Sequence, residues 1–133
     1  MTDDLTAATR AALDRFYAAY TSGDLERMLA LMTDDVTVSF IGHGTFHGKA
    51  EARPYMTWAG TQLPRLDFRV IHKIVDGDRA AVTWDETGVT KRGDTWEAKG
   101  VDVYRIRDGK VVEITVYSDT EKMSRLLEPW PPT

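Results

Sequence analysis

The segment "VDVYRIRDGKVVEITVY" (residues 101–117) has the pattern of two β-strands joined by a tight Gly-containing turn. Side chains on a strand alternate between two faces. When the first strand is extended back to residue 96, one face carries a mostly apolar set: Trp96, Ala98, Gly100, Asp102, Tyr104 and Ile106. Asp102 is the exception, since a carboxylate lies in the middle of the apolar face. The pattern therefore predicts a buried sheet face that contains one acidic group.

Further strands precede this pair. Residues 66–75 and 80–89 alternate in the same way and are separated by "DGD" (76–78), and "KRGD" (91–94) joins them to the strand that carries Asp102. Four alternating segments with Gly-containing turns predict an antiparallel meander. A short apolar segment, "VTVSF" (36–40), predicts one more strand.

The first half of the chain is helical in pattern. Apolar residues recur at helical spacing from Leu5 to Tyr20, a second stripe follows Asp24, and residues 50–60 predict a third helix after a Gly-rich loop at 41–49. Ser118 and Glu121 suggest a capping box for a short final helix. We therefore expect a single α+β domain over residues 1–133, in which three N-terminal helices pack on a curved, mainly antiparallel sheet that encloses a cavity.

The composition narrows the class of protein. The 133 residues include 17 basic and 21 acidic side chains, which give a net charge of −4. No basic surface for nucleic acid, long apolar segment for a membrane or signal-peptide pattern is evident. The chain has no cysteine. We expect a cytoplasmic protein that binds neither nucleic acid nor membrane.

Three segments carry a family resemblance: "FYAAYTSGDLERMLALMTDDVTVSF" (16–40), "FHGKAEARPYM" (46–56) and "VDVYRIRDGKVVEITVYSDTEK" (101–122). Together they resemble the NTF2-like superfamily, and within it the SnoaL-like and ketosteroid-isomerase-like group. The resemblance implies a cone-shaped fold around a ligand cavity. It does not choose among the isomerases, polyketide cyclases, epoxide hydrolases, dehydratases and transport factors of that superfamily.

The resemblance transfers to single residues only in part. In ketosteroid isomerases an Asp at the position of Asp102 donates a hydrogen bond to the developing oxyanion. The second donor, a Tyr of the first helix, aligns with Phe16, and the catalytic base aligns near Ser39 and Phe40. An Arg typical of limonene-epoxide hydrolases is replaced by Gly100. The SnoaL-like cyclases are the nearest group, and they imply proton transfer from a pocket carboxylate without a cofactor.

Pairing across the predicted hairpins extends the face of Asp102. Two-residue turns would place Asp102 opposite Thr83 and His72 opposite Ala81, with Asp85 on the same face. The predicted catalytic residues are thus Asp102, His72 and Asp85. Each has a structural alternative: Asp102 as a buried acid bonded to a helix side chain, His72 as a core residue, and Asp85 as a solvated strand end.

The remaining wall of the predicted cavity is apolar and aromatic. The predicted function is acid/base chemistry without a cofactor or metal on a small apolar ketone or polyketide-like molecule, and the alternatives are a ligand carrier and an interaction protein. The predicted ligand-binding residues are Phe16, Tyr20, Phe40, Tyr55, Thr83, Tyr104, Ile114, Val116 and Ser118.

Other polar residues have simpler expected roles. His43 and His47 have the i, i+4 spacing of a zinc site, but they lie in a Gly-rich segment without a third ligand, so no metal is predicted. Asp119 is expected to cap the last helix. The outer sheet face mixes charges with apolar residues and predicts a homodimer through this face; these residues are Ile71, Trp84, Val101, Val103 and Tyr117.

Overall fold

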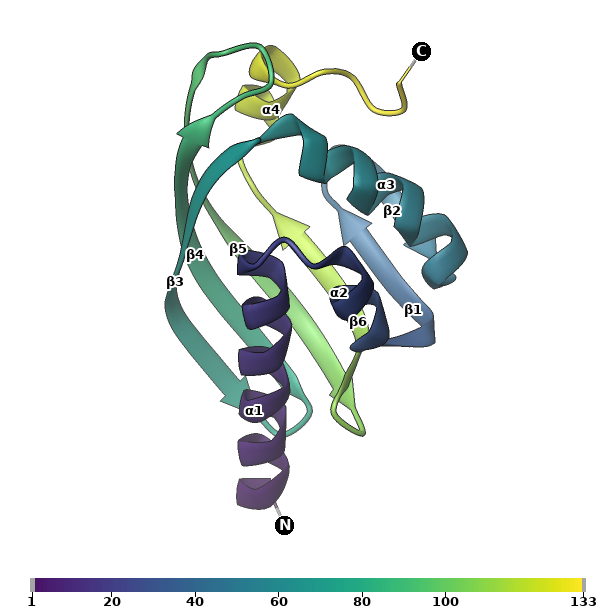
Figure 1. Ribbon diagram of the computed structural model, residues 1–133. Coiled ribbons are helices and arrows are strands. Elements are labelled where there is room, and N and C mark those ends of the chain that lie inside the picture. Colours follow the sequence, from purple (N-terminus) through teal and green to yellow (C-terminus); the bar gives the residue numbers. More distant parts are fainter. Residues whose placement is uncertain (1, 133) are drawn as a thin grey trace.

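The computed structural model describes residues 2–132, with side chains from residue 3, and has helices on one face of a six-stranded sheet (Figure 1). The predicted α+β class, with a curved and mainly antiparallel sheet, is confirmed. The elements in chain order are α1 (Thr2–Thr21), α2 (Leu25–Ala30), β1 (Met32–Phe40), β2 (Gly44–His47), α3 (Gly48–Gln62), β3 (Arg65–Asp76), β4 (Arg79–Val89), β5 (Thr95–Arg107), β6 (Lys110–Tyr117) and α4 (Thr120–Leu126).

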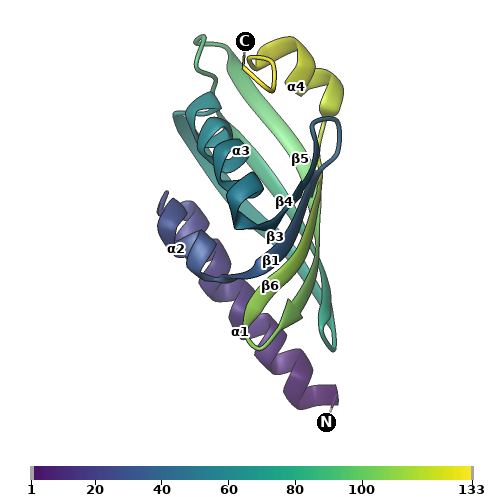
Figure 2. The same ribbon diagram turned by 90° about the vertical axis from the view of Figure 1, so that its right-hand side faces the viewer.

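The sheet has the strand order β2-β1-β6-β5-β4-β3. The β1–β6 pair is parallel, and the other neighbouring strands are antiparallel. Figure 2 shows the long strands curving behind the helices, with α1 against one end of the sheet and α3 against the other. The concave side is thereby covered by helices, while the convex side is uncovered.

The helix starts follow local hydrogen bonding. Asp24 caps α2 by accepting a hydrogen bond from the backbone nitrogen of Arg27 at 3.0 Å. Asp119 caps α4 in the same way, accepting from the backbone nitrogen of Lys122 at 2.9 Å, as predicted. The cap is therefore Asp119 itself and not the expected box that begins at Ser118.

Three local expectations differ from the structure. The Gly-rich loop contains β2, whose residues pair with the end of β1. Strand β1 begins at Met32, earlier than the strand expected at 36–40. Helix α3 extends beyond the expected range 50–60 at both ends. It continues through Pro54, which lies beyond its first turn, although proline cannot donate the hydrogen bond to the carbonyl of Ala50.

The β4–β5 connection decides which residues of β4 face the helices. Val89 pairs with Thr95, so the loop contains the five residues 90–94 instead of two. Its ends are tied by the Thr90 nitrogen, which donates to the Asp94 carbonyl oxygen at 2.9 Å. As a result Val82, and not Thr83, lies opposite Asp102. This one-residue shift turns every side chain of β4 to the other face.

The prediction was therefore wrong for two residues of β4. Thr83 and Asp85 lie on the convex face, where Asp85 forms an ion pair with Lys99 at 3.1 Å. The residues that line the concave side instead are Trp84 and Glu86, both less than one-tenth exposed.

The prediction for His72 was wrong for a different reason. The pairing of β3 with β4 shifts between Val70 and His72, so Ile71 is an extra residue in the ladder. The bulge reverses the alternation along the rest of β3. His72 and Ile74 are consequently exposed, Ile74 at 64%, while Val75 packs against the core.

The buried residues form two clusters. The larger packs α1 and α2 against the sheet, and it includes Leu13, Phe16 and Tyr104. The smaller, beside α4, includes Trp84 and Trp96. Within residues 2–132, no helix is long and apolar enough to cross a membrane.

Candidate functional site

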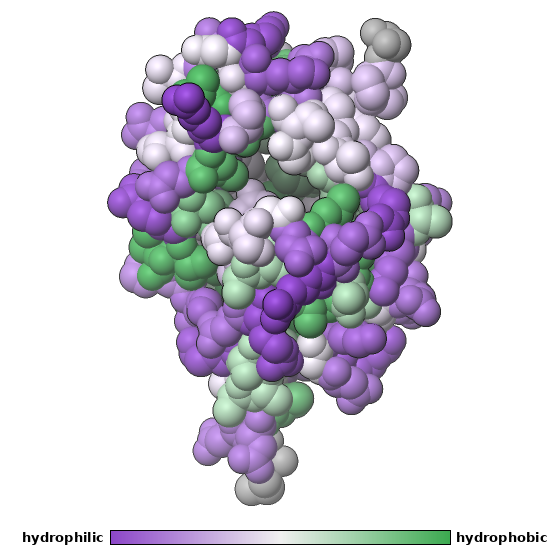
Figure 3. Space-filling view, viewed as in Figure 1, coloured by the Kyte–Doolittle hydropathy of each residue, from purple (hydrophilic) through white to green (hydrophobic). Residues whose placement is uncertain are grey.

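A cavity of about 600 Å³ lies between the concave sheet face and the helices. Figure 3 shows the surface hollowed in the view of Figure 1, with hydrophobic side chains in the depth of the hollow. All the predicted ligand-binding residues except Thr83 line this cavity. Aromatic side chains dominate the wall: Phe16, Tyr17, Tyr20, Phe40, Tyr55, Trp58, Phe68, Trp84, Trp96 and Tyr104.

Asp102 projects from β5 into this wall, as its alternation predicts, and is 6% exposed. Its Oδ1 accepts a hydrogen bond from Trp84 Nε1 at 2.9 Å. Its Oδ2 accepts from the Tyr17 hydroxyl at 2.7 Å and, more weakly, from the Tyr104 hydroxyl at 3.4 Å. Tyr104 also donates to the Tyr17 oxygen at 2.7 Å. Both carboxylate oxygens are therefore occupied by donors of the protein itself.

Burial raises the pKa of Asp102 and the pKa values of the two tyrosines bonded to it. Removal from water raises the pKa of Asp102 to about 6, and the hydrogen bonds from Tyr17, Trp84 and Tyr104 lower it in part. Burial also raises the pKa values of Tyr17 and Tyr104, and the negative charge of Asp102 adds to both increases. Both tyrosines therefore stay protonated as donors at neutral pH.

The residue of α1 that bonds to Asp102 is Tyr17, one position after Phe16, to which the resemblance assigned the isomerase's tyrosine. Both side chains line the cavity, but Tyr17 is the one that contacts Asp102. The sequence signal for this contact was a tyrosine directly after Phe16, since a phenylalanine has no donor for a buried carboxylate.

Gly100 creates the space for one of these donors. A Cβ atom at residue 100 would lie 2.2 Å from the ring of Trp84 and 2.5 Å from the Tyr117 carbonyl oxygen. Gly100 pairs directly with Trp84 across β4 and β5. The indole lies over the glycine, and its nitrogen thereby reaches Asp102.

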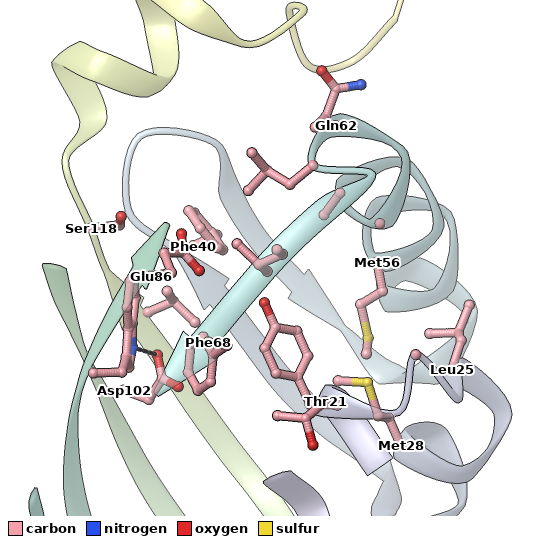
Figure 4. A pocket seen from close by; sticks show the side chains of 18 of the residues that line it. Thr21, Leu25, Met28, Phe40, Met56, Gln62, Phe68, Glu86, Asp102 and Ser118 are labelled. Atoms are coloured by element: carbon pink, nitrogen blue, oxygen red, sulfur yellow. Dashed lines mark hydrogen bonds between the residues drawn. The ribbon is translucent and has the colours of Figure 1, made fainter. Parts of the chain in front are cut away.

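Glu86 is the second buried acid of the wall, on the face that the two-residue turn expected after β4 would have turned outward. Its Oε1 accepts a hydrogen bond from Trp96 Nε1 at 3.0 Å. Within the described chain no group donates to its Oε2, and that oxygen is not sealed inside the protein. Glu86 thus offers an open carboxyl oxygen to the cavity, and Figure 4 shows it above Asp102 on the sheet side.

The environment of Glu86 favours its protonated form. Burial raises its pKa to about 7, the hydrogen bond from Trp96 lowers it, and the nearby charge of Asp102 raises it further. An acid with such a pKa is present in both protonation states near neutral pH. It can therefore accept or release a proton there.

Tyr20 adds a hydroxyl to the same cavity. Burial raises its pKa, and the charges of Glu86 and Asp102 contribute to the increase. In the part of the chain that the structure describes, its hydroxyl has no hydrogen-bond partner, and it is not enclosed by protein. Tyr20 is therefore a protonated donor that a ligand oxygen can use.

The histidines do not join this site. His43 Nδ1 lies 2.7 Å from the Tyr55 hydroxyl, and burial lowers its pKa, which favours the neutral ring. His47 lies at the start of α3, where its backbone nitrogen donates to Glu51 at 2.9 Å. Among the described residues, no three His, Cys, Asp or Glu side chains gather as metal ligands.

Comparison with solved structures supports the fold. An NTF2-like protein of unknown function from Burkholderia pseudomallei is 24% identical, with a TM-score of 0.83 over 92% of this chain and 98% of that chain. TerC, co-crystallised with polyporic acid, is 25% identical, with a TM-score of 0.79 over 90% and 97%. A protein from Jannaschia proposed to be a SnoaL-like polyketide cyclase is 19% identical, with a TM-score of 0.82 over 96% of each chain.

Family comparison gives the assignment. Among curated proteins, none matches the sequence. Residues 13–114 match the SnoaL-like domain family, and this range includes α1 from Leu13 onward, all of β1 to β5, and both buried acids of the cavity. The chain therefore belongs to the SnoaL-like domain family, and its fold is like that of an NTF2-like protein.

Proposed function

We propose that the protein is a small-molecule enzyme that transfers protons in this cavity without a cofactor, and that Glu86 is the group that does so. The observation that carries the proposal is the open Oε2 of a buried acid with a pKa of about 7, set in an aromatic wall. A general base is most effective when its pKa lies near the working pH.

Proton abstraction beside a carbonyl group fits the polar groups of the cavity. Ionised Glu86 takes the proton from the carbon, and the carbon–hydrogen electron pair moves into the enolate. The Tyr20 hydroxyl donates a hydrogen bond to the enolate oxygen, which carries the charge that Glu86 has lost. The number of negative charges in the cavity is unchanged by this step. Protonated Glu86 can then return the proton to another carbon.

Asp102 has a supporting role in this proposal. Its two oxygens are occupied by Trp84 and Tyr17, as in the structural alternative that binds it to a helix side chain. It holds α1 and the Trp84 indole in place, and its charge contributes to the raised pKa of Glu86. In this proposal the proton-transfer group is Glu86 and not Asp102.

The substrate class follows from the wall and from similar proteins. Apolar and aromatic side chains line most of the cavity, which suits an apolar ketone or a polyketide-like molecule. Two further similar proteins, one from Silicibacter and one from Pseudomonas putida, are also proposed polyketide cyclases. TerC was co-crystallised with polyporic acid, and by analogy we propose a ring-containing ligand for this cavity.

Hydrogen–deuterium exchange into 2-tetralone tests the proposal without knowledge of the natural substrate. We expect the protein to accelerate exchange at the carbon beside the carbonyl group in D2O, followed by NMR. Glu86→Gln should abolish this acceleration, while binding, followed by quenching of tryptophan fluorescence, remains. Asp85→Asn, on the convex face, is the matched control and should behave as wild type.

The same assay separates the enzyme from a ligand carrier. Tight binding of 2-tetralone with no acceleration by the wild-type protein would favour the carrier. Acceleration that survives Glu86→Gln would contradict the assignment of the base.

A further inference from the structure

The charged groups of the cavity wall all have the same sign. Asp67, Glu86 and Asp102 line the cavity, with Asp67 exposed at its edge. Among the described residues that line it, none is Lys, Arg or His. The chain has 17 basic side chains, so their exclusion from the wall reflects the fold and not the composition.

The two buried acids differ in how far the protein compensates them. Asp102 receives hydrogen bonds on both oxygens, from Trp84 and Tyr17. Glu86 receives one, from Trp96, and its other oxygen faces the cavity. A ligand that displaces water from this oxygen must donate a hydrogen bond to it, because a buried acceptor without a donor is destabilising.

An anionic ligand would meet no basic side chain among the described residues that line this cavity, and the Tyr20 hydroxyl can offer it a single hydrogen bond. Transfer of a carboxylate or phosphate from water into an apolar site is strongly unfavourable unless a cation or several donors meet it. Here the ligand would also lie beside like charges, which costs several kcal/mol at interfaces in general.

A cationic or neutral ligand meets the opposite conditions. Aromatic faces attract cations through their quadrupole, and tryptophan does so most strongly. Trp58, Trp84 and Trp96 all line the cavity. The open oxygen of Glu86 would accept a hydrogen bond from an ammonium or hydroxyl group of such a ligand.

We infer that the cavity selects its ligand by charge: it takes aromatic or apolar molecules that are uncharged or carry an amine, and it rejects carboxylates and phosphates. This inference rests on the proposed function of the cavity, and it narrows the substrate to ketones without an acidic substituent. Selection follows from the wall as a whole, with Glu86 as the residue that contributes most.

Three naphthalene probes of similar size and different charge test the inference: 2-naphthylmethylamine, 2-naphthylmethanol and 2-naphthoate. Their affinities would be measured by calorimetry at pH 8, where Glu86 is mostly ionised, given its pKa of about 7. We expect the amine and the alcohol to bind at least roughly tenfold more tightly than the acid. The free-energy cost of a like-charge contact is larger than the free energy that corresponds to a tenfold change in affinity.

Glu86→Gln identifies the source of the selection. It should weaken the amine and strengthen the acid, so that the difference between them falls, whereas Asp85→Asn should change neither. Tighter binding of 2-naphthoate, or a difference that Glu86→Gln leaves unchanged, would overturn the inference and leave the proposed cavity function standing. Failure of all three probes to bind would also overturn the inference, and the exchange assay with 2-tetralone then decides separately whether the proposed function stands.

Discussion

The Tyr17 hydroxyl lies 2.7 Å from Oδ2 of Asp102, although the two residues are 85 positions apart in the chain. The bond connects α1 to β5 at the wall of the cavity. Because Tyr104 donates to the same hydroxyl oxygen, one buried network fixes the position of the first helix on the sheet. The geometry of the cavity thus depends on this contact.

Removal of the Tyr17 hydroxyl should lower stability. Tyr17→Phe removes a donor from a buried carboxylate, and such changes typically cost about 1–3 kcal/mol. Tyr20→Phe is the matched control, since the Tyr20 hydroxyl has no partner in the described chain, and it should change stability by less than about 0.5 kcal/mol. Urea denaturation measures both. Equal effects of the two changes would contradict a structural role for the Tyr17 bond.

Asp102→Asn should alter the pH dependence of stability. The pKa of Asp102 is about 6 in the folded protein and 3.8 ordinarily, so between these values the folded state holds a proton that the unfolded state has released. This extra proton stabilises the folded state, fully below pH 3.8, and the stabilisation is lost as pH rises through 6. The asparagine side chain at residue 102 does not titrate, so the variant does not lose stability in this way.

We therefore expect Asp102→Asn to become more stable relative to wild type as pH rises, by on the order of 2–3 kcal/mol between pH 4 and pH 7.5. Denaturation curves at several pH values measure this difference. A relative stability that stays constant, or that changes in the other direction, would show that burial does not raise the pKa of this group.

Trp96→Phe should change the pH profile of activity. The hydrogen bond from Trp96 lowers the pKa of Glu86, so its removal should raise that pKa above about 7. The exchange rate of 2-tetralone requires ionised Glu86 in our proposal, and its midpoint should therefore move to higher pH. This midpoint does not depend on how much protein remains folded. A midpoint that moves downward would contradict the role of Trp96 in positioning and tuning Glu86.

Gln62 should hold the C-terminal segment against α3. It is 2% exposed, and its Oε1 accepts a hydrogen bond from the backbone nitrogen of Glu128 at 2.9 Å. Gln62→Ala should accelerate hydrogen exchange at the Glu128 amide and cost about 1–2 kcal/mol. Lys91→Met, which removes an exposed ion pair with Glu128, is the control and should cost less than about 1 kcal/mol. Unchanged hydrogen exchange at the Glu128 amide in Gln62→Ala would contradict the proposal that Gln62 holds the C-terminal segment.

The homodimer expected from the sequence stays a prediction. Trp84 is not part of the outer face, but Ile71, Val103 and Tyr117 are exposed. We expect a dimer through this convex face, and Val103→Glu should dissociate it. Light scattering at micromolar concentration measures the mass, and a monomeric wild-type protein would contradict the prediction.

The fold could be predicted because its signals are local and repeated. The helical stripe of α1, the capping residues Asp24 and Asp119, and the alternation of β5 each specify one element, and together they allow few arrangements. The position of Asp102 in the cavity wall followed from alternation alone. It required no knowledge of the neighbouring strands.

The rest of the site depends on single-residue shifts. The five-residue loop at 90–94 shifts the pairing of β4 with β5 by one residue and turns the side chains of β4 to the other face. The bulge at Ile71 adds one residue to β3 and does the same to the residues of β3 that follow it. The sequence of a turn does not determine how many residues its loop contains or where a bulge lies. The signal that was missed is the pair of apolar residues Val82 and Trp84, which lie two positions apart and so share the inner face. Glu86 lies two positions further along the strand and therefore belongs to the same face.

Gly100 and Trp84 also constrain how this protein could change. A side chain at residue 100 would occupy the volume of the indole. A basic residue at this position, as in the limonene-epoxide-hydrolase pattern, is therefore accessible only after Trp84 has been replaced by a smaller residue. The order of substitutions is fixed by steric exclusion, and a mutant library that varies residue 100 alone would return mostly glycine. Residues 84 and 100 are therefore sterically coupled, and the Tyr117 carbonyl oxygen, 2.5 Å from a Cβ atom at residue 100, restricts that position even when residue 84 is small.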